Sequence, residues 1–456
     1  MPLQKNQVLT LRVERLSSDG SGVAHSPDGE TVFIPGAAPG DEARVRIVKD
    51  CKRYAFGILD EVLTPSPDRI PVDCAVAGPC GGCSLRHLDY AAELRAKQEN
   101  VADAFARIGG LDVPVLPIVG SPEVNRYRNK VQFPVGVDKS GKPCIGFYAG
   151  RTHRIVPCPD CRLQPGVLNE IGNALCAFFA EKGIQPYSEE TGRGLVRHIF
   201  LRRGAHSGQI MVCLVCTCAK LPCVEELCTR LKAQFAEITT ILLNVNAKNT
   251  NVILGTETHT LYGPGYIEDT LCGVPVQLGP LSFYQVNTLA AEQLYGIAAQ
   301  YAQLTPDDLL LDLYCGMGTI GLSMAAHCRE LIGVEIVPEA IESAKANAAR
   351  MGADVAAKSR FFCADAGQAA TRLAAEGLHP DIVMLDPPRK GCDEATLSAV
   401  VRMSPRRVVY VSCNPATAAR DAAWLEQNGY HAEKVQPVDL FPRTRHCECV
   451  LSLSKV

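Results

Sequence analysis

Short apolar runs alternate with helix-like segments from about residue 305 onward, and this order limits the folds open to the chain. The apolar runs lie at residues 309–314, 331–335, 361–365, 382–386 and 407–411, with helix-like segments at 319–327 and 338–351 between them. Strands that alternate with helices form a parallel, doubly wound sheet. Two further runs, residues 432–438 and 449–454, predict a closing hairpin-like pair. We therefore expect an α/β fold with a Rossmann-like domain over residues 281–456.

The N-terminal part follows a different pattern. Residues 1–65 contain short alternating runs separated by glycines, at residues 8–13, 31–36, 42–48 and 55–59. Short strands at this spacing predict a small closed β-barrel of the oligonucleotide-binding type, although a purely structural barrel would share the pattern. Residues 66–280 mix strands and short helices and predict a central α+β domain.

A helix is expected over residues 89–108. Its apolar side chains recur at helical spacing, and a pair of glycines ends it. The residues of this predicted apolar face are Leu94, Val101, Phe105 and Ile108.

Composition indicates the cellular compartment in which the protein works. The 456 residues contain no apolar run of membrane-spanning length, so no membrane partner is expected, and the first residues lack a signal-peptide segment. These features predict a cytoplasmic protein. Because cytosolic thiols are kept reduced, its 21 cysteines point to metal binding or catalysis before disulfides. No protein partner is evident, and we expect a monomer.

Positive charge gathers in one stretch of a mildly acidic chain. The net charge is −3, but residues 119–203 hold 13 Lys and Arg against 7 Asp and Glu, a balance of +6. A local basic patch of this kind is typical of a surface that binds nucleic acid. The expected phosphate contacts are Arg126, Arg128, Lys130, Arg197 and Arg202.

The turn after the first strand of the predicted sheet looks like a cofactor loop. Asp312 ends the strand, Gly316 and Gly318 allow a tight turn, and Thr319 opens a helix. The glycine loop alone does not identify the cofactor.

Two more carboxylates end the next two strands. Glu335 lies 19 positions after Gly316, where it would accept hydrogen bonds from ribose hydroxyls, and Asp365 would bond an adenine amine. Three carboxylates at successive strand ends favour S-adenosylmethionine as the cofactor. The alternative is a simple turn with solvated strand ends.

Cys413 directly follows the strand-like run 407–411, within Ser412-Cys413-Asn414-Pro415. A thiol at the carboxyl end of a parallel strand lies at the ligand crevice, where a nucleophile is needed for covalent group transfer. A lone cysteine in this position is more often a small core residue. The interpretation therefore depends on the motifs around it.

Three further motifs accompany the Cys413 segment. They are Phe283-Tyr284-Gln285-Val286-Asn287, Leu385-Asp386-Pro387-Pro388-Arg389-Lys390-Gly391 and Asp439-Leu440-Phe441-Pro442-Arg443-Thr444-Arg445-His446-Cys447-Glu448. Together the four resemble the RNA uracil-5-methyltransferases over nearly the whole chain. The likeness is to the ribosomal RNA branch, which carries an N-terminal TRAM barrel and an iron–sulfur cluster.

Two other methyltransferase classes fit the Asp-Pro-Pro segment less well. Amino-methylating enzymes usually follow it with an aromatic residue, where this chain has Arg389. RNA cytosine-5 enzymes place a cysteine directly after the prolines, but here the nearest one is Cys392.

The resemblance implies a complete site and reaction. It makes Cys413 the nucleophile that adds to carbon 6 of uracil and Glu448 the base that removes the carbon 5 proton. It lines the S-adenosylmethionine and uracil pocket with Gln285, Tyr314, Glu335, Asp365 and Asp386.

The implied substrate is a uridine of 23S ribosomal RNA, with TRAM as an RNA-binding module. The same chemistry on transfer RNA, and a non-catalytic RNA-binding factor for ribosome assembly, are the alternatives.

A cluster of cysteines predicts a metal site. Cys74, Cys80 and Cys83 supply three thiolates at a spacing that a radical S-adenosylmethionine enzyme would not use, and the resemblance adds Cys161 as a fourth. Four thiolates suit a [4Fe–4S] cluster. Cys158 keeps an alternative open, since Cys80 and Cys83 with Cys158 and Cys161 would also make a structural zinc site.

Overall fold

A twisted seven-stranded sheet forms the C-terminal part of the computed structural model, which describes residues 3–150 and 152–456. The strand order is β17-β16-β15-β18-β19-β21-β20; the first five strands are parallel, and β21 is antiparallel to both neighbours. The expected parallel sheet and closing hairpin are thus confirmed. The strands are β15 (Leu309–Leu313), β16 (Glu330–Glu335), β17 (Ser359–Cys363), β18 (Ile382–Leu385), β19 (Arg407–Ser412), β20 (Tyr430–Val438) and β21 (Glu448–Lys455).

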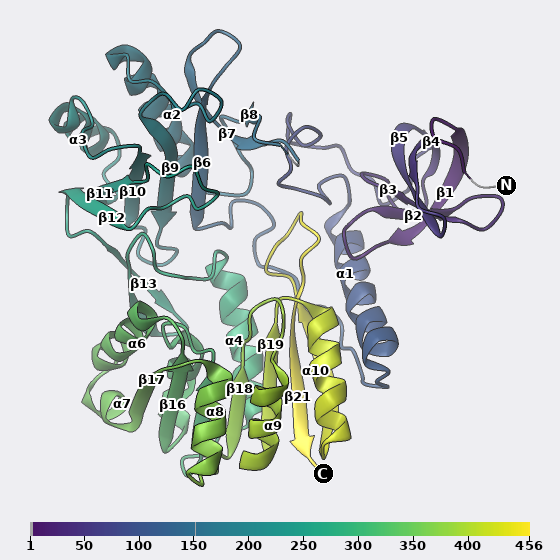
Figure 1. Cartoon of the computed structure of the whole chain (residues 1–456), viewed down its shortest axis with the longest axis vertical. Coiled ribbons are helices and arrows are strands. Elements are labelled where there is room, and N and C mark those ends of the chain that lie inside the picture. Colours follow the sequence, from purple (N-terminus) through teal and green to yellow (C-terminus); the bar gives the residue numbers. More distant parts are fainter. Residues whose placement is uncertain (1–2, 151) are drawn as a thin grey trace.

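Helices cover both faces of this sheet (Figure 1). One core packs the sheet against α4, α5 and α6, and a second core packs its other face against α1, α8, α9 and α10. Strands buried on both faces are mostly apolar, as in β15 (Leu-Leu-Leu-Asp-Leu) and β18 (Ile-Val-Met-Leu). The helices are α4 (Thr288–Ala302), α5 (Thr319–Met324), α6 (Pro338–Arg350), α7 (Ala353–Lys358), α8 (Ala366–Ala375), α9 (Glu394–Met403) and α10 (Pro415–Gln427).

The central part is built on a second seven-stranded sheet, of order β12-β11-β10-β9-β6-β7-β8. All its pairs are antiparallel except β10 with β11, and α2 (Gly166–Lys182) and α3 (Val224–Gln234) pack against one face. A hairpin, β13 (Ile267–Leu271) and β14 (Val274–Leu278), joins the core of the C-terminal sheet. The sheet strands are β6 (Lys130–Val137), β7 (Pro143–Tyr148), β8 (Ile155–Pro157), β9 (Val196–Arg203), β10 (Ile210–Cys216), β11 (Ile238–Val245) and β12 (Glu257–Tyr262).

The N-terminal strands close into a five-stranded barrel of order β1-β2-β3-β5-β4, which stands apart at one side of the molecule in Figure 1. Its side chains alternate between a small apolar core and solvent, as the sequence pattern predicts. The sequence pattern missed β2, which is only four residues long. The strands are β1 (Val8–Leu16), β2 (Gly22–His25), β3 (Thr31–Ile34), β4 (Glu42–Asp50) and β5 (Tyr54–Thr64).

The helix expected over residues 89–108 is present, but it ends in a π turn. α1 (Tyr90–Ala104) is followed by a single π turn, η1 (Phe105–Gly109), and Gly110 ends the segment in the left-handed conformation. The π turn shifts the helical phase, so Ile108 is 57% exposed and not on the buried face. Glu93 and Lys97 are buried in its place. Among the described residues, no helix combines the length and apolar character needed to span a bilayer.

Candidate active site

The register of the C-terminal sheet gathers the predicted site residues at one edge. Leu313 pairs with Val334 and with Leu385, so Tyr314 follows its strand at the level of Glu335 on one side and Asp386 on the other. Ser412 pairs with Cys449, which sets Cys413 across from Glu448 at the next position of the antiparallel pair. Ligands of doubly wound folds bind at this carboxyl edge.

The predicted cofactor loop is a strained turn between β15 and α5. Tyr314 has a φ of +67° and Gly318 a φ of +80°, both in the left-handed region that favours glycine. A Cβ on Gly318 would lie 3.2 Å from that of Ala344, so the loop also packs closely against α6. The hydroxyl of Tyr314 lies 3.4 Å from Thr396 Oγ1.

The Glu335 carboxylate is fixed by backbone donors. Its Oε2 accepts from the N–H of Gly316 at 3.1 Å, and its Oε1 accepts from Ile336 at 2.8 Å and Val337 at 3.0 Å. The cofactor loop and the carboxylate that would hold a ribose are thereby locked together.

Asp365 caps the start of α8. Its Oδ1 accepts from the N–H of Gln368 at 3.1 Å, as the first residue before α8, and its side chain stays partly exposed at the sheet edge.

Two carboxylates lie at this edge, Asp312 buried and Asp386 partly buried. Burial raises the pKa of Asp386 to about 7, and burial with the negative charges of Asp386 and Glu335 raises that of Asp312 to about 8. Asp312 Oδ2 accepts from the N–H of Gly321 at 3.0 Å, and its other oxygen has no partner. Such a site favours a bound cation.

The environment of Cys413 does not favour a thiolate in the free protein. Burial, Glu448 and Asp386 raise the pKa of Cys413 to about 11, with Arg389 opposing the rise. Glu448 is itself buried, and burial with the Asp386 charge raises its pKa to about 8, again against Arg389. Because both pKa values are raised, the Cys413 thiol and the Glu448 carboxyl both favour their protonated forms.

Gln285 reaches the crevice from the segment before α4. Its carbonyl accepts from Asn129 Nδ2 at 2.7 Å, and its side chain bonds Tyr295 on α4. Burial is the main influence that raises the pKa of Tyr295, and the negative charge of Asp386 adds to it. The hydroxyl of Tyr295 therefore lies near both Gln285 and Asp386.

Sequence reasoning missed Tyr295 and Arg389 as site residues. Arg389 directly follows the Asp-Pro-Pro motif and could have been found. Tyr295 lies eight positions beyond the nearest motif residue and carries no local signal.

Five cysteines line one cavity of about 280 Å³ between the central sheet and the segment before α1. Its wall carries Arg86, Arg128, Lys130 and Arg162 and no carboxylate. Within residues 3–150 and 152–456, no group of three or more cysteine, histidine or acidic side chains is close enough to hold a single metal ion. The cysteines are Cys74, Cys80, Cys83, Cys158 and Cys161.

The thiols in this cavity differ in their surroundings. Burial raises the pKa of Cys80 and of Cys83, and Cys83 bonds the Arg86 side chain. A hydrogen bond from Cys158 lowers the pKa of Cys161 and raises that of Cys158. Cys161 is thus the readier thiolate of that pair.

The expected phosphate contacts are wrong for two of the five basic residues. Arg202 is 1% exposed and donates to the carbonyls of Gly279 and Ser282, and Arg197 is buried and donates to those of Asn246 and Lys248. These guanidinium groups satisfy irregular backbone that has no ladder partner.

A third basic residue, Arg126, also makes its hydrogen bonds to other residues of the protein. Arg126 donates to Asp160 and to the carbonyls of Cys161 and Gln164, so it braces the cysteine segment. Arg128 and Lys130 line the cysteine cavity.

Known proteins resemble this chain along its length. The tRNA (uracil-5-)-methyltransferase family matches residues 276–456, and the TRAM domain matches residues 2–59. A Halalkalibacterium halodurans protein named uncharacterized RNA methyltransferase is 43% identical over 453 residues, covering 99% of this chain and 98% of its own. A Bacillus cereus protein of the same name is 41% identical over 456 residues, covering 100% and 98%.

A solved structure shares the architecture. The crystal structure of Pyrococcus abyssi tRNA (uracil-54, C5)-methyltransferase with S-adenosyl-L-homocysteine matches with a TM-score of 0.78 and 26% identity, over 98% of this chain and all of that one. The parallel sheet, its carboxylate edge and these likenesses define an S-adenosylmethionine-dependent RNA methyltransferase. The chain belongs to the tRNA (uracil-5-)-methyltransferase family. It is an enzyme, not a non-catalytic assembly factor.

Proposed function

We propose that this enzyme methylates carbon 5 of a uridine through a covalent bond between Cys413 and carbon 6 of the ring. The observation that carries the proposal is the pairing of β19 with β21, which sets a thiol and a buried carboxylate across from each other at the ligand edge. Carbon 5 of uracil is too electron-poor to attack a sulfonium methyl group unaided. A nucleophile on carbon 6 removes that obstacle.

The proposed reaction balances as follows. As the Cys413 sulfur bonds to carbon 6, its proton passes to Asp386, so that Glu448 stays ionised, and the electrons of the 5,6 double bond move into an enolate. S-adenosylmethionine supplies the methyl group to carbon 5. Glu448 then takes the carbon 5 proton, the double bond re-forms, and the carbon–sulfur bond breaks with its electron pair returning to Cys413. One proton is released over the cycle.

The shifted pKa values support this order of events. A thiol with a pKa of about 11 is neutral at pH 7, so it must lose its proton during the attack. Asp386 and Glu448, with pKa values of about 7 and 8, are the groups that face it. The positive sulfonium would favour the ionised form of both.

The donor would lie across the carboxylate edge. Glu335 and Asp365 would bind the ribose and adenine, Tyr314 would border the loop, and Gln285 and Asp386 would line the space between methyl group and uracil. The backbone bonds that fix the Glu335 carboxylate support its role.

We propose a uridine in 23S ribosomal RNA as the substrate, reached in a loop or flipped from a stem, with the reaction taking place in the cytoplasm. The motif resemblance to the ribosomal branch and the five-cysteine cavity support this choice. Transfer RNA is the second candidate. It is favoured by the full-length likeness to the Pyrococcus abyssi enzyme, which covers the barrel as well.

The cysteine cavity is proposed to hold a [4Fe–4S] cluster on Cys74, Cys80, Cys83 and Cys161. A cluster spreads its four thiolates over four iron atoms, which fits donors that are too far apart for one ion. The cationic wall fits a ligand set that carries negative charge. Bound there, the cluster would tie the segment before α1 to the central sheet.

Mapping of 5-methyluridine by mass spectrometry tests the substrate. RNA from cells with and without the gene is compared, with complementation by wild type and by Cys413→Ala. We expect one or more 23S ribosomal sites to lose the modification and only wild type to restore it. Loss confined to transfer RNA would make transfer RNA the substrate, and no loss in either RNA would overturn the proposed activity.

A further inference from the structure

The loop that carries Glu448 into the crevice is held by segments from other parts of the molecule. This loop, residues 439–447, joins β20 to β21, and Val438 pairs with Glu448 at its base. Four consecutive carbonyls of the loop accept hydrogen bonds from outside the C-terminal sheet. The bonds are Asn287 Nδ2 to Leu440 (3.0 Å), Lys97 Nζ to Phe441 (3.2 Å), Tyr127 Oη to Pro442 (2.9 Å), and the N–H groups of Ser84 (3.0 Å) and Leu85 (3.1 Å) to Arg443.

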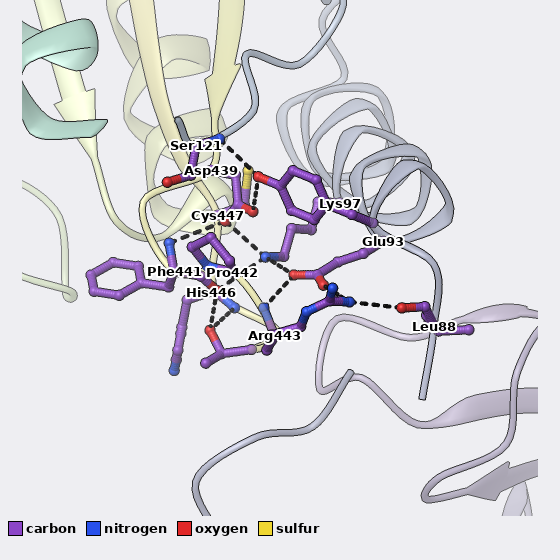
Figure 2. A network of polar contacts seen from close by, with 12 residues as sticks. Leu88, Glu93, Lys97, Ser121, Asp439, Phe441, Pro442, Arg443, His446 and Cys447 are labelled. Carbon is purple, nitrogen blue, oxygen red and sulfur yellow. Dashed lines mark hydrogen bonds and ion pairs between the residues drawn. The ribbon is translucent and has the colours of Figure 1, made fainter. Parts of the chain in front are cut away.

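A buried network of charged side chains, centred on α1, makes several of the contacts that hold this loop (Figure 2). Lys97 Nζ lies 2.7 Å from Glu93 Oε1 and 2.8 Å from Asp439 Oδ1, and the lysine side chain is 2% exposed. Glu93 Oε1 also accepts from the N–H of Arg443 at 2.7 Å, and Arg443 Nη1 donates to the carbonyl of Leu88 at 2.7 Å. Two acids and two bases thus hold the loop against the helix.

Buried charges fix this geometry firmly. Taking an ion out of water is costly unless its partner stays in place, so a shift of the loop along α1 would leave Glu93 or Asp439 uncompensated. Burial lowers the pKa of Lys97, but Asp439 and Glu93 outweigh this and raise it overall. The lysine therefore remains a cation.

A second branch of the network reaches the opposite side of the crevice. The hydroxyl of Tyr90 donates to Asp439 Oδ2 at 2.9 Å and accepts from the N–H of Ser121 at 2.7 Å. Ser121 Oγ accepts from Asn287 Nδ2 at 3.0 Å, two residues after Gln285. The loop of Glu448 and the segment of Gln285 are therefore joined through α1.

We propose that Glu93 and Lys97 are positioning residues for the removal of the carbon 5 proton, acting on Glu448 through Asp439 and Arg443. The inference rests on the proposed role of Glu448. Burial, Asp386 and Arg389 are the influences that shift the pKa of Glu448. The network therefore fixes the position of the Glu448 carboxylate and does not shift its pKa.

A charge-balanced double variant, Glu93→Gln with Lys97→Met, tests the proposal in the full-length enzyme. It removes one negative and one positive charge, which leaves the net charge of the network unchanged. The matched control is Arg95→Met, on the same helix, whose side chain is 58% exposed. The measurements are kcat and KM with RNA, their pH dependence, the melting temperature, and the fraction of enzyme in a denaturation-resistant RNA complex.

The double variant should lower kcat by about 100-fold, the usual effect of a misplaced catalytic group. The midpoint of the pH profile should stay unchanged. The methylated adduct should accumulate because its breakdown is slowed, and KM for RNA should fall with kcat. Arg95→Met should behave as wild type. A fall in kcat without accumulation of adduct, or a folded variant with wild-type kcat, would overturn the proposal.

Tyr90→Phe provides an independent variant should the double variant fail to fold. It removes one hydroxyl from Asp439 and should lower kcat by about tenfold with the same accumulation of adduct. Unchanged kinetics would count against the proposal.

The proposed reaction itself is checked separately, with wild type and RNA containing 5-fluorouridine, whose fluorine no base can remove. Absence of a covalent complex there would refute the reaction. Formation of that complex with normal turnover by Glu93→Gln/Lys97→Met would refute only the positioning role.

Discussion

Two groups of thiols in this protein lie in opposite electrostatic surroundings. Cys413 faces Glu448 and Asp386, whose negative charges raise its pKa, and Arg389 is the cation that opposes them. The five cysteines of the central cavity face arginines and a lysine, and no carboxylate lines their wall. One chain thus has a site that stabilises protons and cations and another that stabilises anions.

The difference indicates what each site is suited to hold. An acidic crevice matches a sulfonium donor and keeps the thiol protonated until a reaction begins. A basic cavity matches several thiolates gathered around a metal cluster. Counting cysteines in the sequence would treat both groups alike, whereas the charges around them separate a proposed nucleophile from proposed ligands.

Replacing Cys413 by Ala should have the largest effect of the variants considered. Turnover should disappear, because no other group would add to carbon 6, while binding of S-adenosylhomocysteine and RNA should remain. Tritium release from RNA labelled at carbon 5 of uridine measures the loss. Cys218→Ala, at an exposed thiol of the central part, serves as the control and should be fully active. Residual turnover by Cys413→Ala would refute the nucleophile.

Glu448→Gln should have the next largest effect. Removing a general base lowers the rate by about 100- to 10,000-fold. Because the adduct still forms, a denaturation-resistant protein–RNA band should appear on a gel. A normal yield of product without that band would remove Glu448 as the base.

Substitutions of the cysteines in the central cavity should reduce the iron content more than the rate of methyl transfer. In protein purified without oxygen, Cys80→Ser and Cys161→Ser should bring the iron content to background. The melting temperature should fall by roughly 2–4 °C for each kcal/mol of stability lost.

Cys158→Ser should keep its iron, since the hydrogen bond between the two thiols favours Cys161 as the thiolate. Iron loss in Cys158→Ser alone would make Cys158 the fourth ligand. Zinc in place of iron in the wild type would contradict the cluster.

The smallest effect is expected from Arg389→Gln, and it should appear as a shift in the midpoint of the pH–rate profile. A base acts only when deprotonated, so kcat should rise with pH and reach half its maximum near pH 8, the pKa of Glu448. Arg389 lowers that pKa, and its loss should move the midpoint to higher pH. A midpoint that moves down would contradict the assigned electrostatics.

The strand-end residues could be predicted from sequence because each follows a short buried run. Glu335, Asp386 and Cys413 all lie directly after such runs, and parallel strands bring their carboxyl ends to one edge whatever the rest of the fold does. The pKa shifts of Asp386 and Cys413 could not be predicted, since these depend on which neighbours share the crevice.

Charged residues of the N-terminal half were harder to place. Glu93 and Lys97 have the spacing of a solvated helical ion pair, and the third partner, Asp439, is 342 residues from Lys97. Arg202 counted toward a basic surface, yet it is buried against backbone carbonyls. Burial of a charge depends on distant segments, which local patterns do not contain.

The covalent bond to Cys413 is the centre of this account, and one measurement tests it directly. Wild-type enzyme is incubated with S-adenosylmethionine and RNA containing 5-fluorouridine, digested with protease and nuclease, and analysed by tandem mass spectrometry. We predict a cross-linked nucleotide that carries both fluorine and the new methyl group on the peptide containing Cys413. A cross-link on another cysteine such as Cys392, or none at all, would contradict the account.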